Sequence, residues 1–297
     1  MKLTARAPAK LNPCLLLGGI RGDGRHELVT VFESVSLCDE LELSLRDGGA
    51  GVDEVVCPGV EGPNLVEAAL AALRARGWNG PGVRIEVRKL IPVAAGMGGG
   101  SADAAATLRL AAALTPAPGG ALEEVAASLG ADVPGQLAPG VTIGTGAGEA
   151  VLAVPALEPH AYAIVPLPFP LSTPDVYREA DRLQLARPDS ELARALQSLT
   201  EALRRPGARL PAELAVNDLQ GAAISLRPEI GDALGAAYQM GADRAFVCGS
   251  GPTVAAAFVG EGARSRADAA AAMLARRYPG ACAAVPVDAG FGVAQFA

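Results

Sequence analysis

The stretch Lys89-Leu-Ile-Pro-Val-Ala-Ala-Gly-Met-Gly-Gly-Gly-Ser-Ala-Asp-Ala-Ala-Ala-Thr-Leu108 decides the fold, because it joins a glycine-rich loop to an alanine-rich helix. Four of the five residues from 96 to 100 are glycine, which lets a backbone approach an anion closely. The unpaired N–H groups and the dipole at the start of a helix favour negative charge. We therefore predict a phosphate-binding loop, with an ordinary flexible strand-to-helix connection as the alternative.

This loop differs from the two common nucleotide-binding motifs. It lacks the G-K-[ST] ending of a P-loop, and it does not open a strand–helix–strand unit as a dinucleotide fingerprint does. A NAD-dependent dehydrogenase is disfavoured, because the chain begins with hairpins and has no first-strand fingerprint.

The first half of the chain alternates short strands with helices. Apolar runs separated by Gly, Asp and Pro predict strands at 3–7, 14–20, 29–37, 41–45 and 83–89. Helical spacing predicts helices at 64–76 and 101–114, with Asn64 as the N-cap of the first and Ser101 at the start of the second. Residues 141–145 and 151–154 fit a hairpin.

A composition shift at residues 155–159 marks the expected boundary between two domains, 1–157 and 158–297. The second half predicts strands at 161–166, 245–248, 254–259 and 282–287, and helices within 175–204, 211–240 and 263–277. Hairpins mixed with helices favour an α+β fold over a regularly alternating parallel sheet.

Composition excludes several classes of protein. The 297 residues carry 25 Lys and Arg against 32 Asp and Glu, a net charge of −7, which is unsuited to general nucleic-acid binding. No apolar run approaches the length of a membrane span, and the first residues contain no secretory signal. Five cysteines without a C-x-x-C pair indicate free thiols. We expect a cytoplasmic protein without a membrane or nucleic-acid partner, either a monomer or a homodimer.

Four further segments could carry chemistry: 7–13, 22–28, 129–134 and 248–254. Lysine occurs only at Lys2, Lys10 and Lys89, so Lys10 in the first segment is a candidate for a compact cation at a phosphoryl-transfer site. Asp132 in the third is a candidate general base, although an Asp before a Pro is often only a turn residue. The segments 22–28 and 248–254 are also consistent with plain turns.

Taken together, these segments resemble the GHMP family of small-molecule kinases. The resemblance is carried by A-P-A-K-L-N at 7–12, D-G-R-H-E-L at 23–28, N-L-V-E-A-A at 64–69, P-V-A-A-G-M-G-G-G-S-A-D-A-A at 92–105, G-A-D-V-P at 130–134, S-T-P-D-V-Y at 172–177, N-D-L at 217–219 and G-S-G-P-T at 249–253. It implies a two-domain α+β fold with the active site in the cleft between the domains. The first two motifs are most similar to those members whose acceptor carries a cytidine diphosphate moiety, in non-mevalonate isoprenoid synthesis.

The resemblance also implies roles for individual residues. ATP would bind with its phosphates on the loop formed by Pro92, Val93, Ala94, Ala95, Gly96, Met97, Gly98, Gly99, Gly100, Ser101 and Ala102. Asn64 and Lys89 would flank the nucleotide, and Ser101 would bind a phosphate or Mg²⁺. Lys10 and Asp132 match the catalytic pair.

The resemblance also implies which residues bind the acceptor. The residues that match the cytidine diphosphate side of the cleft are Asn12, His26, Thr173 and Tyr177. His26 would bond the cytosine edge, and Tyr177 would supply one stacking face.

The sequence departs from the family pattern at three positions. Arg25 stands where relatives usually carry an aromatic residue, and its guanidinium plane could stack on the base instead. Gly135 replaces a common Phe behind Asp132, and Ala102 replaces a common second Ser. Two alternatives therefore stay open: another kinase of this family, acting on homoserine, mevalonate or a sugar, and a nucleotide-binding protein that has lost catalysis.

Overall fold

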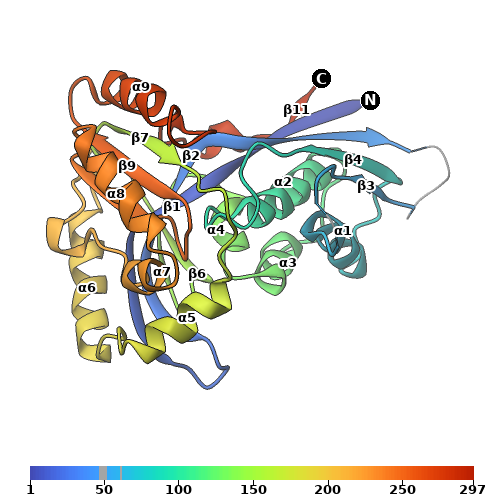
Figure 1. The fold of residues 1–297 in the computed structure, drawn as a ribbon. Coiled ribbons are helices and arrows are strands. Elements are labelled where there is room, and N and C mark those ends of the chain that lie inside the picture. The colour runs from blue at the N-terminus through green and yellow to red at the C-terminus, as the bar shows by residue number, and fades with distance from the viewer. Residues whose placement is uncertain (47–51, 61) are drawn as a thin grey trace.

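The computed structural model describes residues 1–46, 52–60 and 62–297, and its strands form two sheets (Figure 1). The first sheet has the order β11-β1-β2-β4-β3, with β5 paired to β2 and β6 to β5. Its strands are β1 (Lys2–Ile20), β2 (His26–Leu45), β3 (Glu54–Val56), β4 (Val83–Arg88), β5 (Val141–Thr145), β6 (Ala150–Val154) and β11 (Gln295–Phe296).

The first two strands are longer than predicted. We expected a break between 3–7 and 14–20, because Pro8 and Pro13 interrupt that part of the sequence, and this prediction was wrong. The register of β1 against β2 shifts between Pro8 and Ala9 and again between Leu11 and Cys14. Proline fits at such irregularities because a ladder hydrogen bond is not needed there. The separate strands expected at 29–37 and 41–45 are likewise one strand, β2.

Four helices cover one face of this sheet: α1 (Leu65–Ala75), α2 (Gly99–Leu114), α3 (Ala121–Leu129) and α4 (Val133–Leu137) (Figure 1). The predicted cap of α1 is confirmed, because Oδ1 of Asn64 accepts a hydrogen bond from the Val66 N–H at 2.9 Å. Helix α2 begins at Gly99, two residues before the predicted start, and it is buried along most of its length. Small alanine side chains allow this close packing between the sheet and α1.

The second sheet is antiparallel, with the order β10-β7-β9-β8. Its strands are β7 (His160–Val165), β8 (Arg244–Val247), β9 (Val254–Val259) and β10 (Cys282–Ala284). The helices of this half are α5 (Thr173–Arg182), α6 (Asp189–Ala202), α7 (Gln220–Leu226), α8 (Glu229–Gln239) and α9 (Ala263–Leu274), with 3-10 turns η1 (Ala212–Leu214) and η2 (Ala289–Gly292). The α+β prediction is confirmed.

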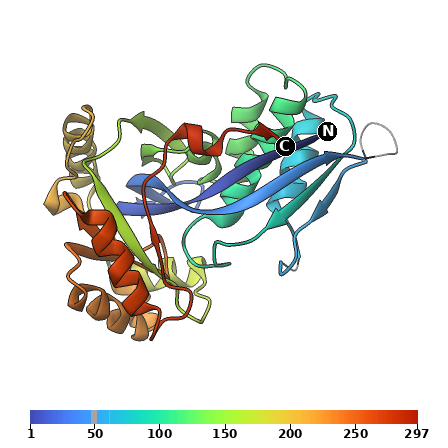
Figure 2. The ribbon, with the colours of Figure 1, turned by 90° about the horizontal axis from the view of Figure 1, so that it is seen from above.

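A small apolar core joins the two halves. Leu11 on β1, Met97 in the glycine loop and Phe246 on β8 belong to the same buried cluster. The chain ends by returning to the first sheet, where Phe296 pairs with Leu3, so both termini lie side by side (Figure 2). A domain boundary near residue 157, between β6 and β7, remains our proposal. None of the helices in the described part of the chain is long and apolar enough to cross a membrane.

Candidate active site

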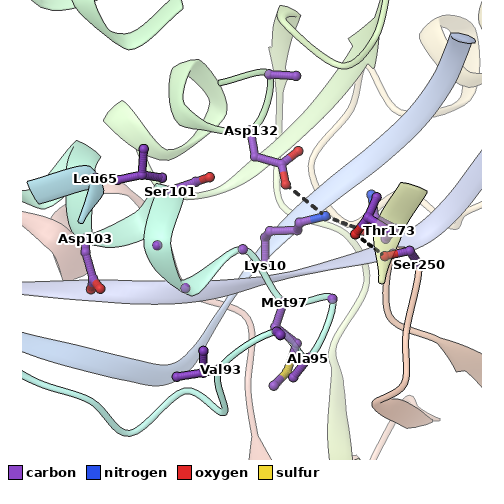
Figure 3. A pocket seen from close by; sticks show the side chains of 18 of the residues that line it. Lys10, Leu65, Val93, Ala95, Met97, Ser101, Asp103, Asp132, Thr173 and Ser250 are labelled. Atoms are coloured by element: carbon purple, nitrogen blue, oxygen red, sulfur yellow. Dashed lines mark hydrogen bonds and ion pairs between the residues drawn. The ribbon is translucent and has the colours of Figure 1, made fainter. Parts of the chain in front are cut away.

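A cavity of about 550 Å³ lies where the two halves meet (Figure 3). The first half contributes Lys10, Asp132 and the glycine loop to its lining, and the second half contributes Thr173 and Ser250. Residues far apart in the sequence therefore share one cavity, as the cleft expected from the sequence requires.

Lys10 and Asp132 face one another at this cavity (Figure 3). The Nζ of Lys10 lies 3.3 Å from Oδ2 of Asp132 and donates a hydrogen bond to Oδ1 of Asn12 at 2.8 Å. The side chain of Lys10 is 9% exposed and that of Asp132 is 31% exposed. The cation is thus held in the wall, while the carboxylate is open to a ligand.

A chain of hydrogen bonds orients Asn12 beneath the lysine. Nδ2 of Asn12 donates to Oγ1 of Thr30 at 2.9 Å, and Thr30 in turn donates to the carbonyl of Cys14 at 2.7 Å. Because Thr30 donates its only proton to that carbonyl, it must accept from the Asn12 amide, and this leaves Oδ1 of Asn12 for Lys10. The Phe32 ring also lies 5.2 Å from the Lys10 ammonium.

The glycine loop requires glycine at its contacts with the rest of the site. Gly96 has φ +78°, and a Cβ there would lie 2.0 Å from the carbonyl oxygen of Cys248. Gly98 has φ +67°, and a Cβ there would lie 3.0 Å from Cγ of Lys10. Only glycine permits this backbone conformation and this approach together.

The loop ends at the first turn of α2, which presents backbone donors. The Ala102 N–H donates to the Gly98 carbonyl at 2.9 Å, which closes the first helical hydrogen bond. In the described part of the structure, the N–H groups of Gly99, Gly100 and Ser101 make no hydrogen bond to protein. Three consecutive donors at a helix start form a site for phosphate oxygens.

A second glycine-rich turn, at 248–254, lies against the glycine loop and Lys10. Nδ2 of Asn217 donates to the carbonyls of Val247 and Gly249 at 2.8 and 2.7 Å, which fixes the start of this turn. The hydroxyl groups of Ser250 and Thr173 lie 2.8 Å apart and both line the cavity. The second half therefore offers two hydroxyl groups beside the Lys10 ammonium (Figure 3).

Comparison with known proteins identifies the family. Residues 64–154 match the GHMP kinases N terminal domain, and residues 190–280 match the GHMP kinases C terminal domain. The 4-diphosphocytidyl-2-C-methyl-D-erythritol kinase of Thermobifida fusca (strain YX) is 41% identical over 296 residues, covering 95% of this chain and 93% of that protein. The chain belongs to the GHMP kinase family. It is therefore an ATP-dependent small-molecule kinase.

Further relatives of this GHMP kinase support the same family. The protein of the same name from Streptomyces coelicolor is 40% identical over 288 residues, and the match covers 93% of both chains. A solved 4-(cytidine 5'-diphospho)-2C-methyl-D-erythritol kinase superposes with a TM-score of 0.73 at 32% identity, covering 96% of this chain and 99% of that one. Homoserine kinase from Cytophaga hutchinsonii shares the fold, with a TM-score of 0.69 at 17% identity.

Lys89 of the kinase lies between two buried carboxylates, those of Asp39 and Asp103. Its Nζ is 2.6 Å from Oδ2 of Asp103, and both carboxylates outweigh the effect of burial and raise the pKa of Lys89. Oδ1 of Asp39 also accepts from the N–H groups of Leu90 and Ile91 at 2.5 and 2.8 Å. Lys89 lines the cavity as predicted, but its charge is already balanced there.

Asp103 is the most perturbed carboxylate of the site. Burial raises its pKa to about 7, although Lys89 acts in the opposite direction. Its Oδ1 is buried and has no hydrogen-bond partner among the described residues. The carboxylate directly follows the glycine loop, so burial and Lys89 act on it in opposite directions next to the phosphate-binding turn.

Most of the other predicted nucleotide residues line the cavity. They are Asn64, Pro92, Val93, Ala94, Ala95, Gly96, Met97, Gly98, Gly99, Gly100 and Ser101. Ala102 is the exception, because it lies on the face of α2 that is completely buried in the core and does not line the cavity. The Oδ1 of Asn64 is engaged as a helix cap, so its amide N–H₂ is the group left for a ligand.

Only some of the residues predicted to bind the acceptor line the cavity. Asn12, Thr173 and Tyr177 line the cavity, and burial together with the charge of Asp132 raises the pKa of Tyr177 to about 12. The His26 and Tyr177 rings lie 5.2 Å apart, but His26 does not line the cavity. Arg25 does not line it either, because its guanidinium binds Asp23 at 2.9 Å in the β1–β2 turn.

The sequence analysis did not single out several polar and aromatic residues at or next to this site: Thr30, Phe32, Asp39, Asp103 and Ser250. Asp103 and Ser250 lie inside quoted motifs, so their position was a usable signal. Thr30, Phe32 and Asp39 come from β2, and only strand pairing places them next to Lys10 or Lys89.

Proposed function

We propose that this kinase transfers the γ-phosphoryl group of ATP to a hydroxyl of 4-diphosphocytidyl-2-C-methyl-D-erythritol, the 2-hydroxyl, in non-mevalonate isoprenoid precursor synthesis. The observation that carries the proposal is the match, over nearly the whole chain, to relatives of that name, together with a Lys10–Asp132 pair facing the cavity. The alternative acceptors, homoserine and mevalonate, belong to relatives that share the fold at under 20% identity.

In the proposed reaction, Asp132 takes or orients the proton of the acceptor hydroxyl. The hydroxyl oxygen then forms a bond to the γ-phosphorus as the bond to the β-phosphate oxygen breaks and ADP leaves. Lys10 stabilises the charge that develops on the transferred group, and its low exposure strengthens that interaction. The N–H groups of Gly99, Gly100 and Ser101 hold phosphate oxygens in line.

Mg²⁺ fits this site as a companion of the nucleotide. No group of three His, Cys, Asp or Glu side chains suited to a metal occurs in residues 1–46, 52–60 and 62–297. Mg²⁺ usually binds through substrate phosphates and water with one or two protein oxygens, so the hydroxyl of Ser101 is our candidate ligand. When bound, the ion neutralises charge on the phosphate oxygens.

The cytidine diphosphate moiety is assigned to the side of the cavity formed by Asn12, Thr173 and Tyr177. Tyr177 offers a stacking face. Its neighbour His26 contacts the Gly18 carbonyl through Nδ1 at 2.9 Å and Asp181 through Nε2 at 3.2 Å, so it must give up one of these contacts to bond the base edge. Arg25 supplies the second stacking face in this proposal, and its guanidinium must leave Asp23 to do so.

The test is ATP turnover with 4-diphosphocytidyl-2-C-methyl-D-erythritol as acceptor, compared with mevalonate, homoserine and galactose. We expect phosphorylation of the cytidyl acceptor alone. Clear turnover of another acceptor without turnover of the cytidyl compound would overturn the substrate, and binding of ATP without turnover of any acceptor would favour a protein that has lost catalysis.

A further inference from the structure

Arg109 on α2 is a half-buried cation that holds three backbone carbonyls from three different parts of the chain. Its Nη1 donates to the carbonyl of Gln136 at 2.5 Å, its Nε to that of Gly292 at 2.8 Å and its Nη2 to that of Arg6 at 2.9 Å. Burial lowers the pKa of the guanidinium to about 10, so it remains charged at neutral pH. In the described part of the chain it forms no ion pair, and these carbonyls are its partners.

Two of these carbonyls belong to the elements that carry the catalytic pair. Arg6 lies four residues before Lys10 on β1, and Gln136 lies in α4, whose N-cap is Asp132. One guanidinium therefore connects the strand of the lysine to the helix of the carboxylate. The third carbonyl comes from η2, just before the chain returns to pair with β1.

Helix α4 needs such support from outside because its own sequence is a poor helix former. It consists of Val133-Pro-Gly-Gln-Leu137, and it follows Gly130, which has φ +157°. A helix of five residues with Pro and Gly is unstable by itself. Gly135 has no side chain of its own to pack against Val151, whose Cγ1 would lie 3.6 Å from an added Cβ.

The last carbonyl groups of a helix have no hydrogen-bond donor within that helix. Arg109 donates to the one at Gln136. The planar fork of arginine reaches three acceptors in fixed directions, which the single ammonium of lysine cannot do. We infer that Arg109 is a positioning residue for phosphoryl transfer, which sets the place of Asp132 relative to Lys10 by holding α4, β1 and the C-terminal segment together. This inference rests on the proposed role of Asp132.

The experiment is a double-variant cycle between Arg109→Lys and Asp132→Asn, with Arg264→Lys as the control. Arg264 is an exposed arginine on α9 that pairs with Asp268. Because a misplacement of about 1 Å can cost about 10²-fold in rate, we expect Arg109→Lys to lower kcat by roughly 10- to 100-fold with the Kd for ATP within about twofold. In the Asp132→Asn background, the same change should lower kcat by less than about threefold, because the group it positions is gone.

The outcomes separate this inference from the proposed function. If Asp132→Asn alone keeps near-normal kcat, the proposed role of Asp132 fails. If Asp132→Asn is impaired but Arg109→Lys keeps kcat within about twofold of the starting enzyme, or lowers it equally in both backgrounds, Arg109 has only a structural role. Should Arg109→Lys not fold, Arg109→Ala is assayed with and without ethylguanidinium, and only recovery of kcat on addition supports positioning.

Discussion

The ammonium of Lys10, in the middle of a long strand, lies 3.3 Å from the carboxylate of Asp132 at the start of a five-residue helix. The pair is asymmetric, because the lysine is almost buried and the aspartate is partly open to the cavity. A buried cation placed beside an accessible carboxylate suits a reaction that removes a proton from a ligand and then builds negative charge next to the cation.

Asp132→Asn should lower kcat by about 10² or more, because the amide cannot accept the proton of the acceptor hydroxyl. The measurement is steady-state turnover with both substrates saturating. The matched control is Asp232→Asn, since Asp232 is an exposed aspartate of α8. A near-normal rate for Asp132→Asn would mean that this carboxylate only shapes the turn before α4.

Gly96→Ala should destabilise the protein by about 1–3 kcal/mol and raise the KM for ATP, because the new Cβ meets the Cys248 carbonyl and the φ angle is left-handed. Urea unfolding and ATP kinetics measure the two effects. Gly119→Ala is the control, since a Cβ at Gly119 meets nothing within 4 Å. Equal behaviour of the two variants would contradict the close approach between the two glycine-rich turns.

Asp103→Asn should remove a pH-dependent part of the stability. The pKa of Asp103 is about 7 in the folded protein against an ordinary 3.8, so between these values the folded state binds a proton that the unfolded state has released. This group therefore contributes stability at low pH that is lost as the pH rises through about 7.

The free energy of unfolding, measured in urea from pH 4 to 8, checks this prediction. Relative to the Asp103→Asn variant, the starting protein should lose free energy of unfolding as the pH rises across this window. A difference that stays constant with pH would show that Asp103 does not titrate there, and Lys89 would then hold it ionised throughout.

Tyr177→Ala should raise the KM for the cytidyl acceptor by about tenfold and leave the KM for ATP nearly unchanged, since stacking on an aromatic ring is worth about 1–3 kcal/mol per base. Arg25→Ala should also weaken acceptor binding more than ATP binding if the guanidinium forms the other face. An effect of Tyr177→Ala alone would agree with the Arg25–Asp23 pair in the structure and remove arginine from the base site.

The glycine loop, the N-cap at Asn64 and the α+β class could all be predicted from local sequence, because each depends on neighbouring residues and on backbone preference. Strand continuity was harder to predict. Pro8 and Pro13 are typical of breaks, but they coincide with register shifts in β1, which only the pairing with β2 reveals. Helix α3 was missed, although Ala121, Val125 and Leu129 recur at helical spacing in its nine residues.

For this protein, the sequence by itself determined which residue types were available for phosphoryl transfer: a rare lysine at position 10, an aspartate at 132 and a run of glycines between them. Tertiary structure alone decided how they are arranged. It balanced Lys89 with Asp39 and Asp103, and it placed Arg109 between the strand of Lys10 and the helix of Asp132. The physical reason is that charge balance and position depend on groups up to 183 residues apart, whose contacts exist only after the helices and the C-terminal segment have packed against the first sheet.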